Sequence, residues 1–202
     1  PIRIWIPGCS SGEEVYSILI VLLESLGDNA QNTEIQIFAT DISEKVIKIA
    51  RAGLYSYDVE QSISSERLKK FFVKVDNGYQ ISKVIRDSCV FAIHNLVSDP
   101  PFSKVDLVIC RNLLIYFDSA LQEKVIPIFH YALNSRGFLV LGSAESIGGY
   151  SNLFENIDQK RRIYAKKSNT SLRYPDLPFG LSKDSEYHEE KNMKRTGHQN
   201  TE

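Results

Sequence analysis

Hydrophobic positions in the first part of the chain switch between the spacing of strands and the spacing of helices. Apolar residues cluster over 2–6 and 34–41, which predicts two short strands. Over 13–26 and 44–52 they recur every three or four positions, which predicts two helices, each followed by a glycine that can end it. Strand, helix, strand and helix in this order are typical of a parallel, doubly wound α/β sheet with a crevice at the carboxyl ends of its strands.

A different pattern follows in the middle of the chain. Residues 65–72 predict a short helix, and the alternating stretch after it surrounds Asn77-Gly78, a pair typical of tight β-hairpins. We therefore expect a small antiparallel β insertion over about 69–95. Residues 89–96 return to a strand of the core.

The alternation of strands and helices then resumes. Residues 105–112 predict the fourth core strand, and residues 120–132 predict a helix in which Pro127 is a kink or a break. Arg136-Gly137 predicts a turn. The remaining strands are expected at 138–142 and 162–165.

Composition sets the limits of the folded part. The chain has 202 residues, of which 43% are hydrophobic, enough for one α/β domain with a sizeable core. Apolar periodicity fades over 168–202, so we expect a domain over 1–167 followed by a polar linker or disordered tail. Pro1 leads into a strand without an initiator Met, and we expect a piece of a longer protein.

Charge and cysteine content exclude several classes of function. The formal net charge of −1 gives no basic field for nucleic acid, and the longest apolar runs are too short to span a bilayer. Cys9, Cys89 and Cys110 are far apart and lack the spacing of metal ligands. We therefore expect reduced thiols in a cytoplasmic protein that has no metal site and does not insert into a membrane.

The stretch Gly8-Cys9-Ser10-Ser11-Gly12, between the first strand and the first helix, allows two interpretations. It fits the G-x-S-x-G elbow of α/β-hydrolases, in which Ser10 would be the nucleophile. It also fits a glycine turn whose free N–H groups, at the start of a helix, hold a nucleotide-like ligand. The hydrolase needs a catalytic histidine in a late loop, and neither His94 nor His130 has that place in the pattern. This favours the ligand cradle.

Acidic residues near the turn favour a nucleoside ligand. Asp41 ends the second strand about 30 residues after the turn, where an acid can accept both hydroxyls of a ribose. The alternative is that Asp41 caps the helix that begins near Ser43. Glu14, in the first helical turn, either contacts the ligand or only complements the helix dipole. The turn is not G-x-G-x-x-G, so a single nucleoside such as S-adenosylmethionine fits better than a dinucleotide.

Polar residues after the later strands are expected to face the same crevice. They are Asn95-Leu96, Arg111-Asn112 and Tyr116, although Tyr116 could also be a rim aromatic of the core. The stretch 99–102, Asp-Pro-Pro-Phe, is similar to a motif of amino-methyltransferases that act on nucleic-acid bases. In those enzymes the motif directly ends the fourth core strand, whereas here it precedes residues 105–112.

In combination, the motifs resemble those of one family, the CheR chemotaxis receptor methyltransferases. The matching stretches span about 3–167 and are "GCSSGEEVYSI", "FATDISEKVIKIARAGLY", "NL", "VICRNLLIYFDSALQEKVI" and "GFLVLGSAES". They look most similar to CheR domains of hybrid chains, in which a CheB-like methylesterase precedes and PAS or kinase modules follow. The resemblance implies the seven-stranded, Rossmann-like sheet of class I methyltransferases. It also implies methyl transfer from S-adenosylmethionine to glutamates of a methyl-accepting chemoreceptor, with S-adenosylhomocysteine as the product.

The resemblance also implies roles for single residues. Tyr116 falls on the tyrosine beside the transferable methyl group. The positions that bind the cofactor by motif are Glu14, Asp41, Asn95, Leu96, Arg111 and Asn112. The turn itself adds Gly8, Ser10 and Gly12.

Departures from the family pattern leave a second function open. The helical N-terminal domain and linker that CheR proteins carry lie outside this sequence. The hairpin insertion is short, with an Asp-Asn-Gly turn, unlike members that dock a receptor pentapeptide there. The alternative to an enzyme is a signalling module that binds the cofactor without turnover.

Overall fold

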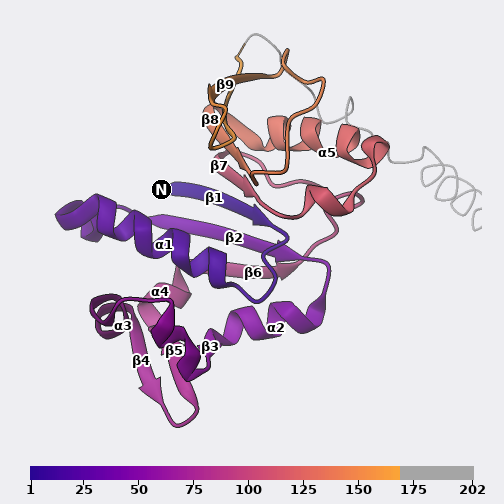
Figure 1. Cartoon of the computed structure of the whole chain (residues 1–202). Helices are drawn as coiled ribbons and strands as arrows, with labels where there is room; N and C mark the ends of the chain where they lie inside the picture. The colour runs from indigo at the N-terminus through magenta and orange to yellow at the C-terminus, as the bar shows by residue number, and fades with distance from the viewer. Residues whose placement is uncertain (169–202) are drawn as a thin grey trace, which may run out of the picture.

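The computed structural model describes residues 1–168, and its centre is a seven-stranded sheet with the order β6-β2-β1-β7-β8-β10-β9 (Figure 1). The polar segment expected over 168–202 therefore lies outside the described residues, apart from Ser168. The strands of this sheet are β1 (Ile2–Pro7), β2 (Ile35–Asp41), β6 (Cys89–Ile93), β7 (Val105–Cys110), β8 (Leu133–Leu141), β9 (Phe154–Asp158) and β10 (Ile163–Lys166).

Strand directions confirm the predicted doubly wound sheet. The pairs β1–β2, β2–β6, β1–β7 and β7–β8 are parallel, whereas β10 is antiparallel to both β8 and β9. The chain runs outward from β1 through β2 to β6, then crosses back to place β7 on the other side of β1. Parallel sheets of this kind bind ligands at such a switch point, beyond the carboxyl ends of the strands.

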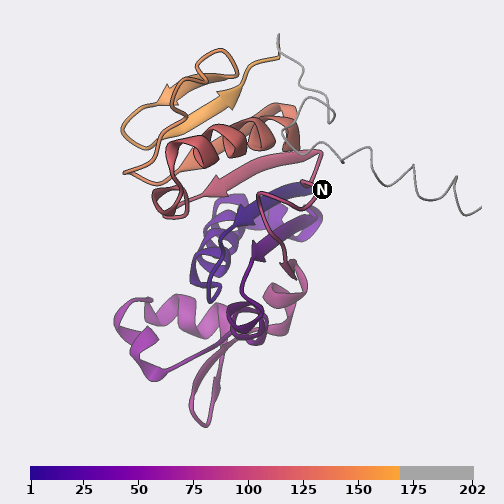
Figure 2. The same ribbon diagram turned by 90° about the vertical axis from the view of Figure 1, so that its right-hand side faces the viewer.

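Helices cover both faces of the sheet. Successive residues of a strand point in opposite directions, so neighbouring residues of β1 pack against different helices. Ile4 and Ile6 of β1 pack in one buried cluster with α1 (Glu13–Leu26) and α2 (Glu44–Ala52). Trp5 packs in a second cluster with α5 (Ser119–Ala132) on the opposite face (Figure 2). The shorter helices are η1 (Gly27–Asn32), η2 (Tyr57–Gln61), α3 (Ser65–Phe71), α4 (Lys83–Asp87) and η3 (Leu114–Tyr116).

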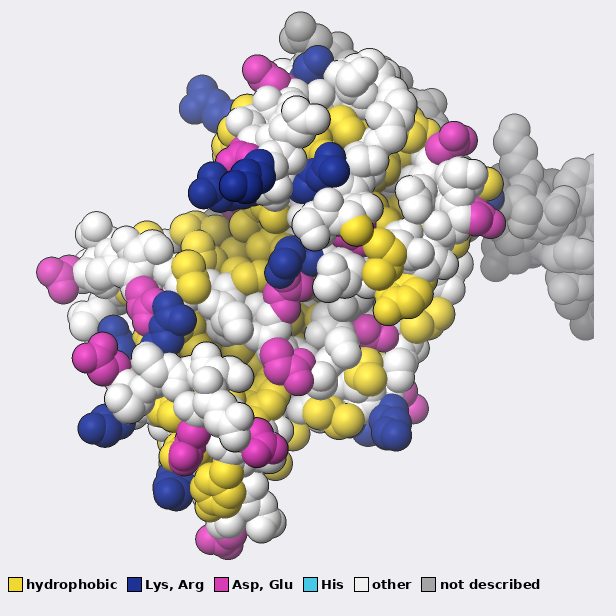
Figure 3. All heavy atoms as spheres, viewed as in Figure 1, with side chains coloured by type: hydrophobic (Ala, Val, Ile, Leu, Met, Phe, Trp, Pro, Cys, Tyr) yellow, Lys and Arg dark blue, Asp and Glu magenta, His cyan; other side chains and the backbone are white. Residues whose placement is uncertain are grey.

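Part of the sheet beside α1 remains apolar and accessible. Leu107 of β7 and Val140 of β8 are only partly buried, and the ring of Phe138 is 42% exposed. Figure 3 shows apolar side chains gathered in the middle of this face. On this face, helices therefore bury the side chains of β1 and β2, whereas those of β7 and β8 are less completely covered.

Two glycines define the limits of the helices over the first sheet face. Gly12 precedes α1 in a left-handed conformation with φ +91°, and Gly53 follows α2 with φ +57°. The Gly53 N–H donates to the carbonyls of Ile49 and Ala50, which satisfies the end of α2. The bounds predicted for both helices are confirmed.

Of the two outcomes predicted for Pro127, the break does not occur, because α5 continues through this residue. A proline has no N–H to donate to the carbonyl four residues earlier, which here belongs to Glu123. The hydroxyl of Tyr150 donates to that carbonyl at 2.7 Å and takes the place of the missing helix bond. Sequence spacing alone does not reveal a donor that arrives from a distant loop.

The predicted antiparallel insertion is confirmed, but it contains a third strand. The small sheet has the order β3-β5-β4, with β3 (Leu54–Tyr55), β4 (Phe72–Val75) and β5 (Gly78–Ile81). Val75 pairs with Gly78, so the hairpin loop is Asp76-Asn77, one residue earlier than Asn77-Gly78. Gly78 has φ +144°, and a Cβ there would collide with the Tyr55 carbonyl of β3.

Strands β8 and β9 differ most from the prediction. The strand β8 runs from Leu133 to Leu141, so Arg136-Gly137 lies within a strand and does not form a turn. Its pairing with β7 shifts register between Val105 and Leu107, which allows the irregular start. The strand β9 was not predicted, because only its first residue is buried and the stretch lacks apolar alternation.

Candidate active site

A cavity of about 210 Å³ lies at the carboxyl ends of the four strands around the switch point. Pro7 ends β1, Gly8 follows it, and Asp41 ends β2. The other lining residues come from the ends of β2 and β6 and from the turn after β7, and they are Thr40, Ile42, His94, Asn95, Leu96, Val97, Leu113 and Phe117. The predicted crevice is therefore a pocket to which four separate segments contribute.

The glycine turn is shaped by both backbone conformation and packing. Gly8 has φ +71°, and an added Cβ there would approach the side chain of Leu113 to 3.0 Å. Gly12 has φ +91°, and an added Cβ would approach Ala50 of α2 to 3.0 Å. Ser10, between them, is also left-handed with φ +48°. The glycines thus let the turn lie close to α2 and to the segment after β7.

Asp41 connects the turn to the second helix. Its Oδ2 accepts a hydrogen bond from the Ser10 N–H at 3.1 Å, and its Oδ1 accepts one from the Ser43 N–H at 3.0 Å. Ser43, and not Asp41, is the N-cap residue of α2, and no side chain caps this helix, so the capping interpretation of Asp41 is wrong. Each carboxylate oxygen can accept more than one bond, so Asp41 can also bind a ligand. The Asp41 side chain therefore braces the turn from within the pocket wall.

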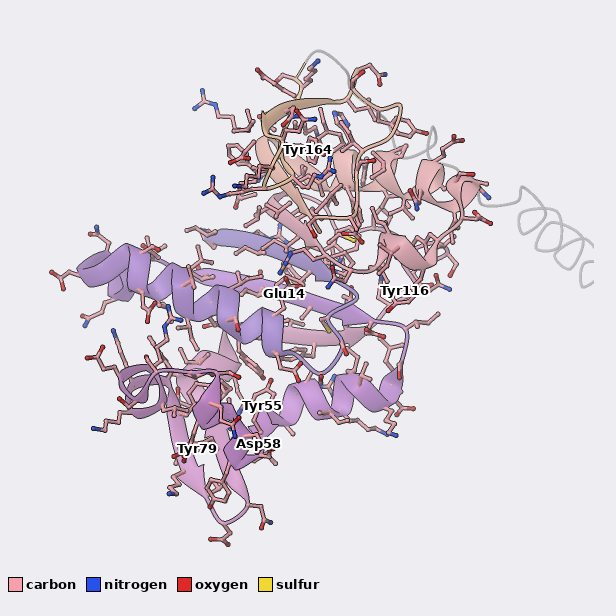
Figure 4. All side chains as sticks on the ribbon, viewed as in Figure 1. Glu14, Tyr55, Asp58, Tyr79, Tyr116 and Tyr164 are labelled. Carbon is pink, nitrogen blue, oxygen red and sulfur yellow. The ribbon has the colours of Figure 1, made fainter. Side chains whose placement is uncertain are left out.

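Glu14 and Arg111 form an ion pair at the same edge of the sheet. The Arg111 Nη1 lies 2.6 Å from the Glu14 Oε1, and the side chains are 49% and 28% exposed. The pair joins the first turn of α1 to the end of β7, and Figure 4 shows Glu14 beside the strand ends. Exposed pairs contribute little to stability. The Glu14–Arg111 pair instead places one negative and one positive group next to the turn.

Asn95 and Leu96 form an ordered corner after β6. The Asn95 Oδ1 accepts from the Val97 N–H at 3.0 Å, and the Asn95 N–H donates to Asp99 at 2.8 Å. Leu96 is 7% exposed and belongs to the second buried cluster. The 99–102 stretch therefore shapes this corner and precedes β7, the fourth strand of the main sheet along the chain, as predicted.

Tyr116 lies at the rim and not in the pocket lining. It ends η3, its N–H donates to the Leu113 carbonyl at 3.1 Å, and its side chain is 79% exposed. Figure 4 shows Tyr116 on the same side of the sheet as Glu14, whereas Tyr55 and Tyr79 belong to the small sheet. Tyr116 is thus accessible from outside the molecule.

Hydrolase chemistry finds no support at the turn. Burial, with the nearby charge of Asp41, raises the pKa of the Cys9 thiol to about 12, so this group stays protonated. The rings of His94 and His130 are hydrogen-bonded to the carbonyls of Pro100 and Lys167. Within residues 1–168, neither ring is bonded to Ser10, and the elbow lacks its base.

Several residues in or beside the cavity were not predicted from the sequence. Leu113 and Phe117 wall the pocket on the side of β7, and Ile42 is a 69% exposed apolar residue at its opening. Glu145, after β8, is a buried carboxylate bonded to the same segment as Leu113. Two signals in the sequence could have indicated them. Ile42 is an apolar residue directly after Asp41, the acid predicted to bind a ribose, and Glu145 is an acid in a loop of mostly small residues.

The seven-stranded sheet with the order β6-β2-β1-β7-β8-β10-β9, in which β10 is antiparallel to both of its neighbours, is the class I methyltransferase fold, as predicted. Residues 1–163 match the family model of the CheR methyltransferase, SAM binding domain. The chain belongs to this family, whose cofactor is S-adenosylmethionine.

Individual relatives agree with this assignment. The chain is 37% identical over 155 residues to a chemotaxis protein methyltransferase of Borreliella burgdorferi, covering 75% of this chain and 55% of that protein. It is 37% identical over 157 residues to chemotaxis protein methyltransferase 2 of Vibrio cholerae, covering 76% of this chain and 54% of that protein. An uncharacterized 104.1 kDa protein of Rhodobacter capsulatus is 36% identical over 180 residues, which are 89% of this chain and 19% of that protein. The chain thus spans about half or less of the length of these relatives.

Two further findings bear on partners and metals. Among residues 1–168, no helix is long and apolar enough to cross a membrane. In the same range, no group of three or more His, Cys, Asp and Glu side chains is arranged to hold a metal ion.

Proposed function

We propose that the protein transfers a methyl group from S-adenosylmethionine to glutamate side chains of a methyl-accepting chemoreceptor. The observation that carries this proposal is the pocket at the switch point, which combines the glycine turn with Asp41 and lies beside the exposed Tyr116. Family membership and the names of the relatives support the same reaction and the same class of substrate.

The pocket residues suit the parts of the cofactor. Asp41 keeps free acceptor positions for the ribose hydroxyls, while its bonds to Ser10 and Ser43 fix its orientation. Leu96, Leu113 and the other apolar walls suit the flat faces of an adenine ring. Together with the corner at Asn95, these side chains would hold the nucleoside.

The Glu14–Arg111 pair complements the methionine end of the cofactor. That end carries an ammonium group and a carboxylate, and the pair offers one charge of each sign beside the turn. Free N–H groups at the start of α1 add a preference for a carboxylate. We assign Ser10, Gly8 and Gly12 to shaping the turn and Asn112 to shaping the segment after β7.

The proposed reaction does not require the protein to act as a general acid or base. When bound, S-adenosylmethionine supplies an electrophilic methyl group with its own leaving group. A glutamate side chain is ionised at neutral pH, with an ordinary pKa of about 4.3, and needs no general base. The protein has to align the carboxylate with the methyl group and exclude water. We assign the Tyr116 hydroxyl, at an exposed residue of the rim, to orienting the incoming carboxylate.

The setting of the domain is part of the proposal. We infer that it works in the cytoplasm, next to the cytoplasmic part of a receptor, and within a longer hybrid chain. The 19% share of the Rhodobacter capsulatus protein that it matches supports a domain of a larger protein.

The proposal is tested with methyl-labelled S-adenosylmethionine and a receptor fragment that contains the acceptor glutamates. We expect label on the receptor that mild alkali releases as methanol, the behaviour of a methyl ester. A receptor fragment with those glutamates changed to alanine is the control and should stay unlabelled. Calorimetric binding of S-adenosylhomocysteine without transfer would instead identify a cofactor-binding signalling module.

A further inference from the structure

Glu145 is a buried carboxylate that holds two separate strand ends together. Its side chain lies in the loop after β8, and the residue is 4% exposed. Its Oε1 accepts hydrogen bonds from the N–H groups of Leu113 and Leu114 at 2.9 and 2.8 Å, and its Oε2 accepts one from Gly142 at 2.6 Å. The carboxylate thus joins the segment after β7 to the end of β8.

The space around this carboxylate is closely fitted. A Cβ on Gly142 would lie 2.6 Å from the Glu145 Oε2 and 3.0 Å from the Asn112 Oδ1. Asn112 has a left-handed backbone with φ +56°, which turns the chain so that the next two N–H groups point at Glu145. An asparagine tolerates this conformation better than most residues. The Glu145 carboxylate, Gly142 and Asn112 are therefore packed closely against one another.

These three residues fix the position of the pocket wall at Leu113 and of the turn that carries Tyr116. Leu113 donates its N–H to Glu145, and its side chain lies over Gly8 and lines the cavity. The Leu113 carbonyl accepts from the Tyr116 N–H at 3.1 Å, and the Leu114 carbonyl accepts from Phe117 at 3.0 Å. A change at Glu145 would therefore move a pocket wall and the turn that carries Tyr116.

We propose that Glu145 is a positioning residue for cofactor binding and methyl transfer, acting through the segment 112–117. The inference rests on the proposed function, because it concerns the same pocket. Glu145 does not line the cavity, so its influence passes through Leu113 and Tyr116. A purely structural role is the alternative, and a comparison with a second carboxylate separates the two.

The chain offers that comparison at the opposite ends of the same strands. Asp106 of β7 accepts from the Arg3 N–H of β1 at 2.9 Å and from the Asn134 side-chain amide of β8 at 2.6 Å. It ties neighbouring strands together as Glu145 does, but at the N-terminal end of β7, whereas the pocket lies at the carboxyl end. Asp106→Asn is therefore the matched control for Glu145→Gln.

The test measures thermal unfolding, S-adenosylhomocysteine affinity and methyl transfer for both variants of the full chain. Glutamine presents an N–H₂ donor where Gly142 needs an acceptor, so we expect Glu145→Gln to weaken S-adenosylhomocysteine binding about tenfold or more and to lower kcat. Asp106→Asn should lower the melting temperature while the affinity and kcat of its folded fraction stay at wild-type values. Wild-type affinity and kcat in Glu145→Gln would overturn the proposal.

Further measurements guard against a variant that does not fold. Gly142→Ala pushes on the carboxylate from its other side and should weaken binding in the same direction. In the wild-type chain, the amide resonances of Leu113, Leu114 and Gly142 should shift when S-adenosylhomocysteine is added, and that of Arg3 should not. Unchanged resonances at all of these amides, with binding seen by calorimetry, would overturn the inference alone. Failure of the wild type to bind S-adenosylhomocysteine would instead remove the proposed function.

Discussion

At the scale of single residues, Asp41 carries the most testable assignment. Its carboxylate accepts a hydrogen bond from the Ser10 N–H of the turn, and we propose that it also accepts bonds from the ribose hydroxyls. Loss of a charge-assisted hydrogen bond costs about 1.5–3 kcal/mol, so Asp41→Ala should weaken S-adenosylhomocysteine binding about tenfold or more. Calorimetric titration measures this, with Asp87→Ala on α4 as the control, since Asp87 forms an exposed ion pair with Lys83. Equal affinity of Asp41→Ala and wild type would refute the ribose assignment.

Tyr116 belongs to a different step from Asp41. Its side chain is 79% exposed, so Tyr116→Phe should leave the melting temperature and the affinity for S-adenosylhomocysteine nearly unchanged. If the hydroxyl orients the receptor carboxylate, methyl transfer falls about tenfold, because the contact matters mostly in the transition state. Single-turnover kinetics with a receptor fragment measure the change. Unchanged turnover would leave Tyr116 as an apolar rim residue.

The sequence reveals some pocket residues and hides others for a physical reason. Asp41 and Asn95 are visible because polar residues after strands of a doubly wound sheet face the crevice. Leu113 and Phe117 are apolar residues in an apolar stretch, where a pocket wall and a core residue look the same. The bonds of Glu145 reach back more than thirty residues, as the 31- and 32-residue separations show, and no local pattern encodes them.

At the scale of elements, α5 shows how a proline is accommodated within a helix. The Tyr150 hydroxyl replaces the N–H that Pro127 lacks at the Glu123 carbonyl. We expect Tyr150→Phe to lower the free energy of unfolding by about 0.5–1.5 kcal/mol, the net value of such a bond. In a Pro127→Ala background the same change should cost less, because the alanine N–H can pair with Glu123. Urea denaturation of the two single variants and the double variant measures the coupling, and strictly additive effects would contradict it.

Element boundaries were predictable where local signals coincide. The bounds of α1 and α2 are those predicted, since apolar spacing and a terminal glycine agree at each. The start of β8 was not, because Arg136-Gly137 carries a turn signal and the pairing with β7 overrides it. In the hairpin, the loop lies one residue earlier than the Asn-Gly signal indicates, because Gly78 pairs with Val75, and a Cβ at Gly78 would collide with the carbonyl of Tyr55.

At the scale of the whole molecule, the candidate site and the hydrophobic core occupy different parts of the sheet. The polar contacts of the pocket gather where the parallel strands end, and buried clusters fill both faces behind them. His130, in the last turn of α5, belongs to the stabilising part. It is 1% exposed, its Nδ1 has no hydrogen-bond partner within residues 1–168, and its ring packs edge-on against Phe154.

This buried histidine should make the stability of the fold depend on pH. Burial and then the positive charge of Lys166 lower the pKa of His130 below its usual 6.5, more than the Lys167 carbonyl raises it. The folded chain therefore binds fewer protons than the unfolded chain between the two pKa values, and the free energy of unfolding falls as the pH drops below about 6.5. The slope from this group is at most about 1.4 kcal/mol per pH unit. Urea denaturation between pH 7 and 5.5 should show the decline in the wild type and a flatter profile in His130→Gln. Parallel profiles for the two proteins would mean that another group titrates and that His130 stays neutral throughout this range.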